Sequence, residues 1–167
     1  LFNDYAVVNN IVQIYILAVG ERLPSWLETG VNCYIERMPR ECKVQVVTIA
    51  TPKRLKNQTT KQAQDREQKL LIKNTPGNSL RIVLDEHGET WTTTLLAKKF
   101  QHWRQSSPVV SFYIGGPDGF TQDFLQQANF VWAMSSLTMP HMLVRILLVE
   151  QLYRVWTIAQ GHPYHRQ

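Results

Sequence analysis

The most reactive combination of side chains lies at the end of the chain, in the tail His162-Pro163-Tyr164-His165-Arg166. Two imidazoles, a phenol and a guanidinium within five residues can transfer protons, stack on a ring or bind an anion. Chain ends without a function usually fray, so this concentration of polar groups favours a functional tail. Two neighbouring histidines also suggest a metal, but no thiol or carboxylate accompanies them, and we expect no metal site.

A glycine turn, residues 113–120 with the sequence Tyr-Ile-Gly-Gly-Pro-Asp-Gly-Phe, follows the apolar run 109–114. Ligands of parallel sheets bind beyond the carboxyl ends of strands, where glycine lets them approach backbone groups. The spacing matches neither the dinucleotide fingerprint nor a phosphate-binding loop. Taken alone, the segment is only a tight turn. The segments downstream make it a predicted ligand site.

The next candidate segment, residues 133–141, is small and apolar and carries several hydroxyls. Such a surface suits a flat purine held against backbone groups. By themselves, however, Ser135 and Ser136 are more typical of a turn or a helix cap.

Four segments in the last third of the chain resemble the RlmH family and stand at that family's spacing. They are residues 114–117, 137–141, 143–145 and 162–166. The family belongs to the SPOUT class of S-adenosylmethionine-dependent RNA methyltransferases, and it methylates N3 of a pseudouridine in bacterial 23S ribosomal RNA. The resemblance extends from the strand near Gln13 to the last residue, although residues 51–78 match only in character.

The resemblance implies a fold and a cofactor site. The fold is α/β, a mostly parallel sheet with helices on both faces and a C-terminal deep trefoil knot built from residues 82–86, 114–119 and 134–139. Without the resemblance, an unknotted sheet would be the default expectation. The residues implied to hold S-adenosylmethionine are Leu84, Gly115, Met134, Ser135, Ser136, Leu137, Thr138 and Met139.

Alternating strand-like and helical patterns support a mostly parallel, doubly covered sheet. They predict strands at residues 13–19, 43–49, 80–84, 109–114 and 130–134. They predict helices at residues 24–38, 59–73, 93–105, 121–129 and 140–160.

The excess positive charge lies in one segment. Residues 53–73 hold seven basic and two acidic residues, and the rest of the chain holds eleven of each. A basic helix is often only a solvated face, but this concentration suggests contact with a polyanion. We expect ribosomal RNA to be recognised by shape and backbone. The RNA-binding candidates are Lys53, Arg54, Lys56, His141, Arg145 and Arg166.

Methyl transfer needs an aligned nucleophile more than a strong acid or base, but N3 of a uracil ring must first lose its proton. His165 is the first candidate for the base, Arg154 for electrostatic support, and Tyr164 for stacking on or hydrogen bonding to a flipped base. Arg166 is placed to bind phosphate.

The last helix is apolar too far around its axis for a single buried face. It is either buried within one monomer or covered by a partner, and the family resemblance implies a symmetric homodimer. The rival functions are another SPOUT enzyme acting on tRNA or a ribose 2′-hydroxyl, and a non-catalytic RNA-binding protein of the ribosome.

Composition sets the remaining expectations. With 167 residues, a single domain needs no disulfide or metal, and we read Cys33 and Cys42 as reduced thiols. No apolar run approaches the roughly 20 residues that span a bilayer, so we expect a cytoplasmic protein without a membrane segment. Residues 1–11 do not fit the family pattern and are expected to be a leader or an added extension. Residues 12–167 then form a single SPOUT methyltransferase domain.

Overall fold

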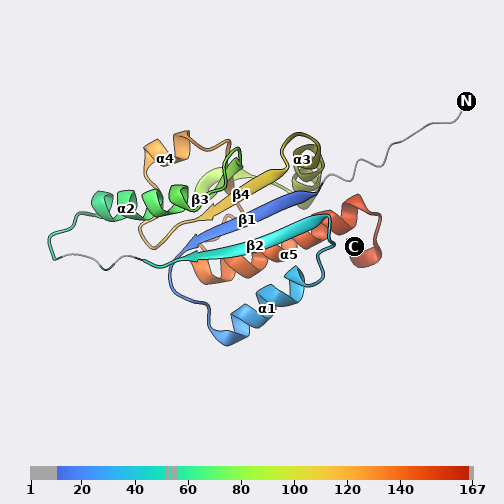
Figure 1. Ribbon diagram of the computed structural model, residues 1–167, viewed down its shortest axis with the longest axis horizontal. Coiled ribbons are helices and arrows are strands. Elements are labelled where there is room, and N and C mark those ends of the chain that lie inside the picture. Colours follow the sequence, from blue (N-terminus) through green and yellow to red (C-terminus); the bar gives the residue numbers. More distant parts are fainter. Residues whose placement is uncertain (1–10, 52, 54–55, 166–167) are drawn as a thin grey trace, which may run out of the picture.

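A five-stranded parallel sheet lies between two layers of helices (Figure 1). The computed structural model describes residues 11–51, 53 and 56–165. The strand order is β2-β1-β4-β3-β5, and each pair of neighbours is parallel. The bounds are β1 Val12–Val19, β2 Cys42–Ile49, β3 Leu80–Thr90, β4 Val109–Ile114 and β5 Phe130–Ala133.

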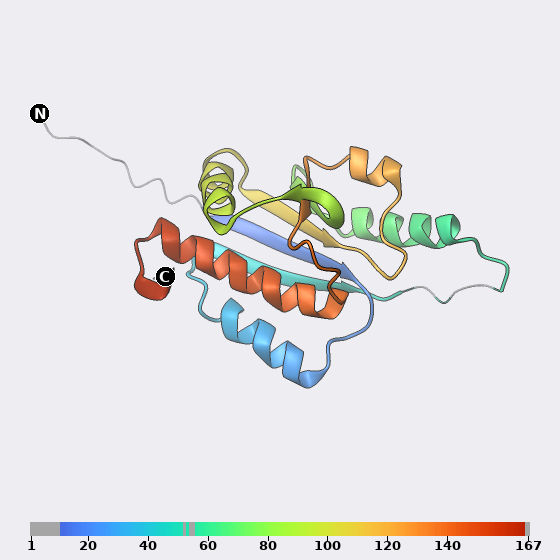
Figure 2. The ribbon, with the colours of Figure 1, turned by 180° about the vertical axis from the view of Figure 1, so that it is seen from behind.

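The helices divide between the two faces of the sheet. The helices α1, α3 and α5 pack together on one face, and Figure 2 shows α5 running across it. The helices α2 and α4 cover the other face, where Leu71 and Phe124 join a separate apolar cluster. The bounds are α1 Ser25–Ile35, α2 Thr60–Lys73, α3 Thr93–Ser106, α4 Gln122–Gln126 and α5 His141–Ala159, followed by a short 3-10 helix, Pro163–His165.

Threonine caps fix the starts of three helices. The side chains of Thr59, Thr92 and Thr121 each accept a hydrogen bond from a backbone N–H of the first turn. At α2 the Gln62 side chain also accepts from the Thr59 backbone, which completes a capping box. These caps explain why the helices begin close to where the sequence pattern predicts them.

Two elements differ from the sequence predictions. Strand β3 continues to Thr90 instead of ending at Leu84, and Trp132 of β5 pairs with both Leu84 and Glu89. The residues between Leu84 and Glu89 form a bulge, where the pairing of β3 with β5 is interrupted. Helix α4 is shorter than predicted because Asn129 leaves it to bond with β3, donating from its backbone to the Arg81 carbonyl and accepting the Arg81 N–H on its side chain.

The predicted fold class is confirmed by the parallel sheet and its two helical layers. The threading that defines a trefoil knot stays a prediction, as does the domain boundary at residues 11 and 12. Residues 1–10 lie outside the described part of the chain. No helix within residues 11–51 and 56–165 is long and apolar enough to cross a membrane.

Candidate functional site

A cavity of about 420 Å³ opens beside the bulge of β3 and the carboxyl ends of β4 and β5. We call it the carboxyl-edge cavity. It is lined by residues 84–87 of β3, by residues 114–120, Gln122 and Leu125, and by Trp132, Met134, Ser135 and residues 137–139, together with His141 and Val144 at the start of α5. Parallel strands end at a common edge, and this volume is in the usual range for small-ligand sites.

The cavity brings together the residues predicted to bind S-adenosylmethionine. Seven of the eight line it: Leu84, Gly115, Met134, Ser135, Leu137, Thr138 and Met139. Ser136 does not. The three segments predicted to build the knot therefore meet at one place. The role of each residue in binding the cofactor stays a prediction.

The glycine turn folds back on itself at the cavity wall. A Cβ added to Gly115 would lie 2.9 Å from the Phe120 ring. A bulky residue at position 115 would therefore displace Phe120, which itself lines the cavity, before it reached a bound cofactor.

Hydrogen bonds tie two of the lining segments together. The Thr138 hydroxyl donates to Glu86 Oε2 at 3.1 Å, joining the bulge of β3 to the segment before α5. The Ser135 hydroxyl accepts from the backbone N–H of Leu137 at 2.9 Å, which shapes the local turn. The serine is thus part of a turn and also part of the cavity wall.

Sequence reasoning missed the acidic part of the wall. Asp85, Glu86 and Asp118 all line the cavity. The signal available was position alone: Asp85 and Glu86 directly follow the strand predicted at residues 80–84, where ligands of parallel sheets bind. His87 is largely exposed, lines the cavity and contacts Asp85 at 3.1 Å. A wall with three carboxylates favours a cationic ligand.

Trp132 is a further residue that sequence reasoning missed. Its ring stacks on Trp91 with centroids 5.0 Å apart, and its indole nitrogen is buried without a hydrogen-bond partner among the described residues. It lines the cavity from the β5 side.

His141 and Arg145, one turn apart on α5, have different environments. His141 lines the cavity, and burial together with the Arg145 cation lowers its pKa, so the imidazole is neutral at neutral pH. Arg145 is fully buried and donates to the carbonyl oxygens of Val19 at 3.2 Å and Glu21 at 3.4 Å. It also donates to the Thr48 hydroxyl. The side chain of Arg145 thus ties the ends of β1 and β2 to α5, and its contact with RNA stays a prediction that its burial does not support.

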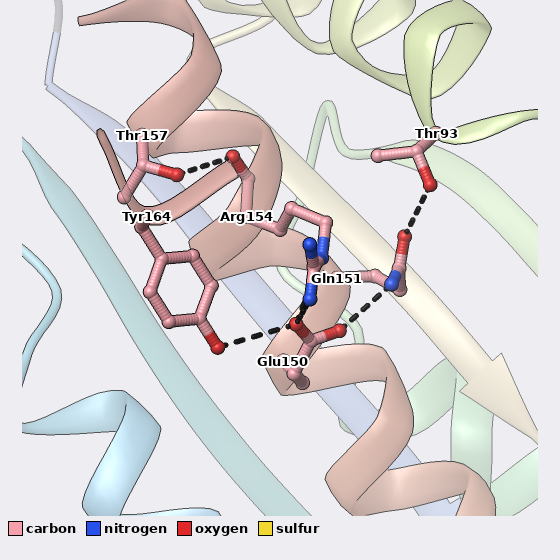
Figure 3. A network of polar contacts seen from close by, with 6 residues as sticks. All are labelled: Thr93, Glu150, Gln151, Arg154, Thr157 and Tyr164. Atoms are coloured by element: carbon pink, nitrogen blue, oxygen red, sulfur yellow. Dashed lines mark hydrogen bonds and ion pairs between the residues drawn. The ribbon is translucent and has the colours of Figure 1, made fainter. Parts of the chain in front are cut away.

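A polar network surrounds the other catalytic candidates (Figure 3). Arg154 donates from Nε at 2.9 Å and from a terminal nitrogen at 2.6 Å to the same oxygen of Glu150. The Tyr164 hydroxyl donates to that oxygen at 3.4 Å. Gln151 links the second Glu150 oxygen to Thr93 on α3. The carboxylate of Glu150 therefore holds Arg154 and Tyr164 beside each other.

The network fixes the protonation of its members. Burial, followed by the hydrogen bond with Tyr34 and the charge of Glu150, raises the pKa of Tyr164 to about 12. The hydrogen bond from Arg154 to Glu150 raises the pKa of Arg154. At neutral pH Tyr164 is a neutral donor and Arg154 a cation, so neither is suited to remove a proton.

The carboxyl-edge cavity lies at the start of α5, and the network is built on Glu150, Gln151 and Arg154 in the middle and second half of this helix. Ten residues, about 15 Å along the helix, separate Val144 at the cavity from Arg154. Neither Arg154 nor Tyr164 lines the cavity of its own subunit. The His165 side chain and Arg166 lie outside the described part of the structure, as does Arg54.

The basic segment lies beside the glycine turn. Lys53 and Lys56 are exposed, and α2 presents Lys61, Arg66, Lys69 and Lys73 on its exposed face. Lys53 lines a second hollow of about 370 Å³, which shares Pro117 and Asp118 with the carboxyl-edge cavity.

Three large apolar side chains are exposed on α1 and α5. Leu143 and Leu147 lie one turn apart on α5 and are 38% and 39% exposed, and Trp26 at the start of α1 is 66% exposed. The two helices pack against each other in Figure 2. Leu143 and Leu147 are therefore open to solvent in one chain, and the homodimer that would cover them stays a prediction.

Comparison with known proteins identifies the class. A family model described as a predicted SPOUT methyltransferase matches residues 12–165. A solved structure of a probable methylase family protein from Haemophilus influenzae Rd KW20 has a TM-score of 0.53 at 12% identity, covering 95% of this chain and 72% of that one. At this identity the match shows the fold alone. The chain belongs to the SPOUT methyltransferase family.

Within this family, the chain is similar over nearly its whole length to proteins named ribosomal RNA large subunit methyltransferase H. The protein of that name from Hahella chejuensis is 40% identical over 156 residues, covering 93% of this chain and 100% of the relative. Its counterpart from Chromohalobacter salexigens is 43% identical over 155 residues, with the same shares covered.

Proposed function

We propose that this chain transfers a methyl group from S-adenosylmethionine to N3 of a pseudouridine in 23S ribosomal RNA. One observation carries the proposal: seven of the eight residues predicted to hold the cofactor meet in the carboxyl-edge cavity. The near-full-length similarity to large subunit methyltransferases supports ribosomal RNA as the substrate.

The cavity fits this cofactor chemically. S-adenosylmethionine supplies a methyl group on a sulfonium and also carries an ammonium, and Asp85, Glu86 and Asp118 complement both positive charges. Leu84 and Leu137 offer apolar surface for a purine. Gly115 and Gly116 line the cavity, and as glycines they can offer only backbone groups to the cofactor.

A homodimer would complete the site. Leu143, Leu147 and Trp26 form an apolar surface that a two-fold contact can bury. Arg154 lies about 15 Å along α5 from Val144, and neither Arg154 nor Tyr164 lines the cavity of its own subunit, so a second subunit would bring a cavity to both. We therefore place each tail at its partner's cofactor site.

Each tail residue then has a distinct task. Arg154, held as a cation by Glu150, stabilises the negative charge that develops on the uracil ring. Tyr164, protonated at neutral pH, donates a hydrogen bond to the target base. His165 accepts the N3 proton, Arg166 binds phosphate, and the neutral His141 at the cavity is the second candidate for the base.

Lys53, Arg54, Lys56 and the exposed face of α2 would contact the ribosomal RNA backbone. An enzyme that acts on bacterial ribosomes works in the cytoplasm, and the proposed function therefore includes a cytoplasmic location. Clustered cations provide most of the sequence-independent affinity for nucleic acid.

Mixed dimers test the shared site directly. One subunit lacks residues 164–167, and the other carries Gly115→Leu, which displaces the cavity wall. If tails act on the partner, each mixed dimer retains one complete site and about half of the wild-type activity. Tails that act within their own subunit would leave the mixed dimer inactive. The two homodimers, each expected to be inactive, are the controls.

A further inference from the structure

Helix α2 contacts the glycine turn through polar side chains on its inner face. Gln64 and Gln68 lie one helical turn apart, so they share this face. Gln64 donates from Nε2 to the backbone carbonyl oxygen of Asp118 at 2.7 Å. The hydroxyl of Thr121, the residue after the turn, donates to Gln68 Oε1 at 2.8 Å. The helix therefore holds the turn at two points.

The same face leaves little room for the turn to move. A Cβ on Gly116 would lie 2.8 Å from Glu67 Oε2 and 3.2 Å from a Val19 methyl carbon. Glu67 and Gln68 are buried, at 6% and 7% exposed, although both are polar. The backbone of the turn is thus wedged between α2 and β1, in contact with side chains that solvent does not reach.

Neither glutamine lines the carboxyl-edge cavity, but the segment they contact does. Gly115, Gly116, Asp118 and Phe120 of the turn line the cavity. A main-chain shift on the α2 side would move this wall directly. When the side chains that support the wall of a ligand site are removed, the wall can adopt several conformations. Only a fraction of the molecules then has the binding conformation, so the affinity for the ligand falls.

We propose that Gln64 and Gln68 are positioning residues, which fix the glycine turn in the shape that binds S-adenosylmethionine without touching the cofactor. The inference rests on the proposed function, because it takes the carboxyl-edge cavity as the cofactor site. It assigns the inner face of α2 to cofactor binding, whereas the exposed basic face is available to RNA.

The test uses substitutions of similar size that remove or retain one hydrogen-bonding group. Gln64→Glu has nearly the same shape but cannot donate to the Asp118 carbonyl, whereas Gln64→Lys retains a donor. Gln68→Met removes the acceptor of the Thr121 hydroxyl at similar volume. The matched control is Gln101→Glu, the same change at an exposed position of α3, which covers the other face of the sheet.

Binding of S-adenosylhomocysteine is measured by calorimetry, and methyl transfer to ribosomes gives kcat and KM for the cofactor. Loss of one hydrogen bond predicts about three- to tenfold weaker binding in Gln64→Glu and an equal rise in KM. At saturating cofactor, kcat stays within about twofold of wild type, since the reacting groups are untouched. Gln64→Lys restores the affinity, and Gln101→Glu leaves it unchanged.

Equal weakening by Gln64→Glu and Gln64→Lys would overturn the hydrogen bond to Asp118 as the cause. Wild-type affinity in Gln64→Glu would overturn the positioning role while leaving the proposed function intact. If Gln64→Glu fails to fold, the Gln68→Met variant provides the test. Weaker cofactor binding at an unchanged unfolding temperature would support the inference. Unchanged cofactor binding in Gln68→Met would overturn it. A wild-type chain that binds no S-adenosylhomocysteine would instead contradict the proposed function.

Discussion

Replacing Glu150 with glutamine removes the charge at the centre of the tail network. In the native chain, one carboxylate oxygen accepts two hydrogen bonds from Arg154, at 2.6 and 2.9 Å, and one from Tyr164 at 3.4 Å. The amide retains an oxygen of the same size but not its charge. The new side chain would also bring an N–H group into a site that needs acceptors, because Arg154, Tyr164 and Gln151 all donate to Glu150.

The structure sets the size of the expected effect. The side chain of Glu150 is 15% exposed and that of Arg154 is 32% exposed, so solvent screens their ion pair only in part. We expect its loss to cost about 1 kcal/mol, near the upper end for pairs with some exposure. For a chain of this size, about 1 kcal/mol lowers the unfolding temperature by about 2–4 °C.

Glu28→Gln is the matched control. Its pair with Arg22 is longer, at 3.3 Å, and its side chains are 42% and 85% exposed. This substitution should leave the unfolding temperature almost unchanged, since exposed pairs of this kind contribute little. Both variants are melted at the same protein concentration, because the stability of a dimer depends on it.

Methyl transfer to ribosomes at saturating S-adenosylmethionine completes the assay. If Glu150 orients Arg154 in the reaction, a loss of about 1 kcal/mol in transition-state stabilisation lowers the rate about fivefold. Cofactor affinity stays unchanged, because Glu150 does not line the cavity. A Glu150→Gln variant with a lower unfolding temperature and full activity would refute the catalytic part of this reasoning.

Three further predictions concern the surface and the thiols. Leu147→Asp places a charge on the apolar surface of α5 and should yield a folded monomer in sedimentation analysis; an unchanged dimer would move the interface elsewhere. Neutralising Lys53 and Lys56 should make the salt dependence of ribosome binding shallower by about 0.7–0.9 log units per lost phosphate contact, and an unchanged slope would exclude both lysines. Iodoacetamide should modify exposed Cys33 and spare Cys42, whose thiol pKa is raised to about 12 by burial. Because that pKa is higher in the folded state, the contribution of Cys42 to stability is complete below about pH 9 and is lost as pH rises towards 12, which unfolding at graded pH can measure.

The sheet and its helices could be predicted because local signals mark them. Buried parallel strands are continuous apolar runs, and threonine caps such as Thr59 and Thr92 mark helix starts. The extension of β3 had no such signal. Its residues after Leu84 are polar, and their pairing with β5 depends on Trp132, which is more than 40 residues away in the sequence.

Arg145 and Arg154 show where residue type is insufficient. They are nine residues apart on α5, about two and a half turns, so their side chains leave opposite sides of the helix. Arg145 points inward and is buried because the ends of β1 and β2 supply acceptors at Val19 and Thr48. Those acceptors are more than 90 residues away in the sequence, so no local pattern identifies them.

Mass spectrometry of ribosomal RNA after reaction in vitro tests the central claim most directly. Ribosomes that lack the modification are incubated with the purified protein and S-adenosylmethionine, and the nucleosides of 23S RNA are mapped. The account predicts one added methyl group per ribosome, on N3 of a pseudouridine, and none when residues 164–167 are deleted. A methyl group on a ribose or on another base of 23S RNA would contradict the assigned substrate. Cofactor binding without any methylated RNA would contradict the assigned activity.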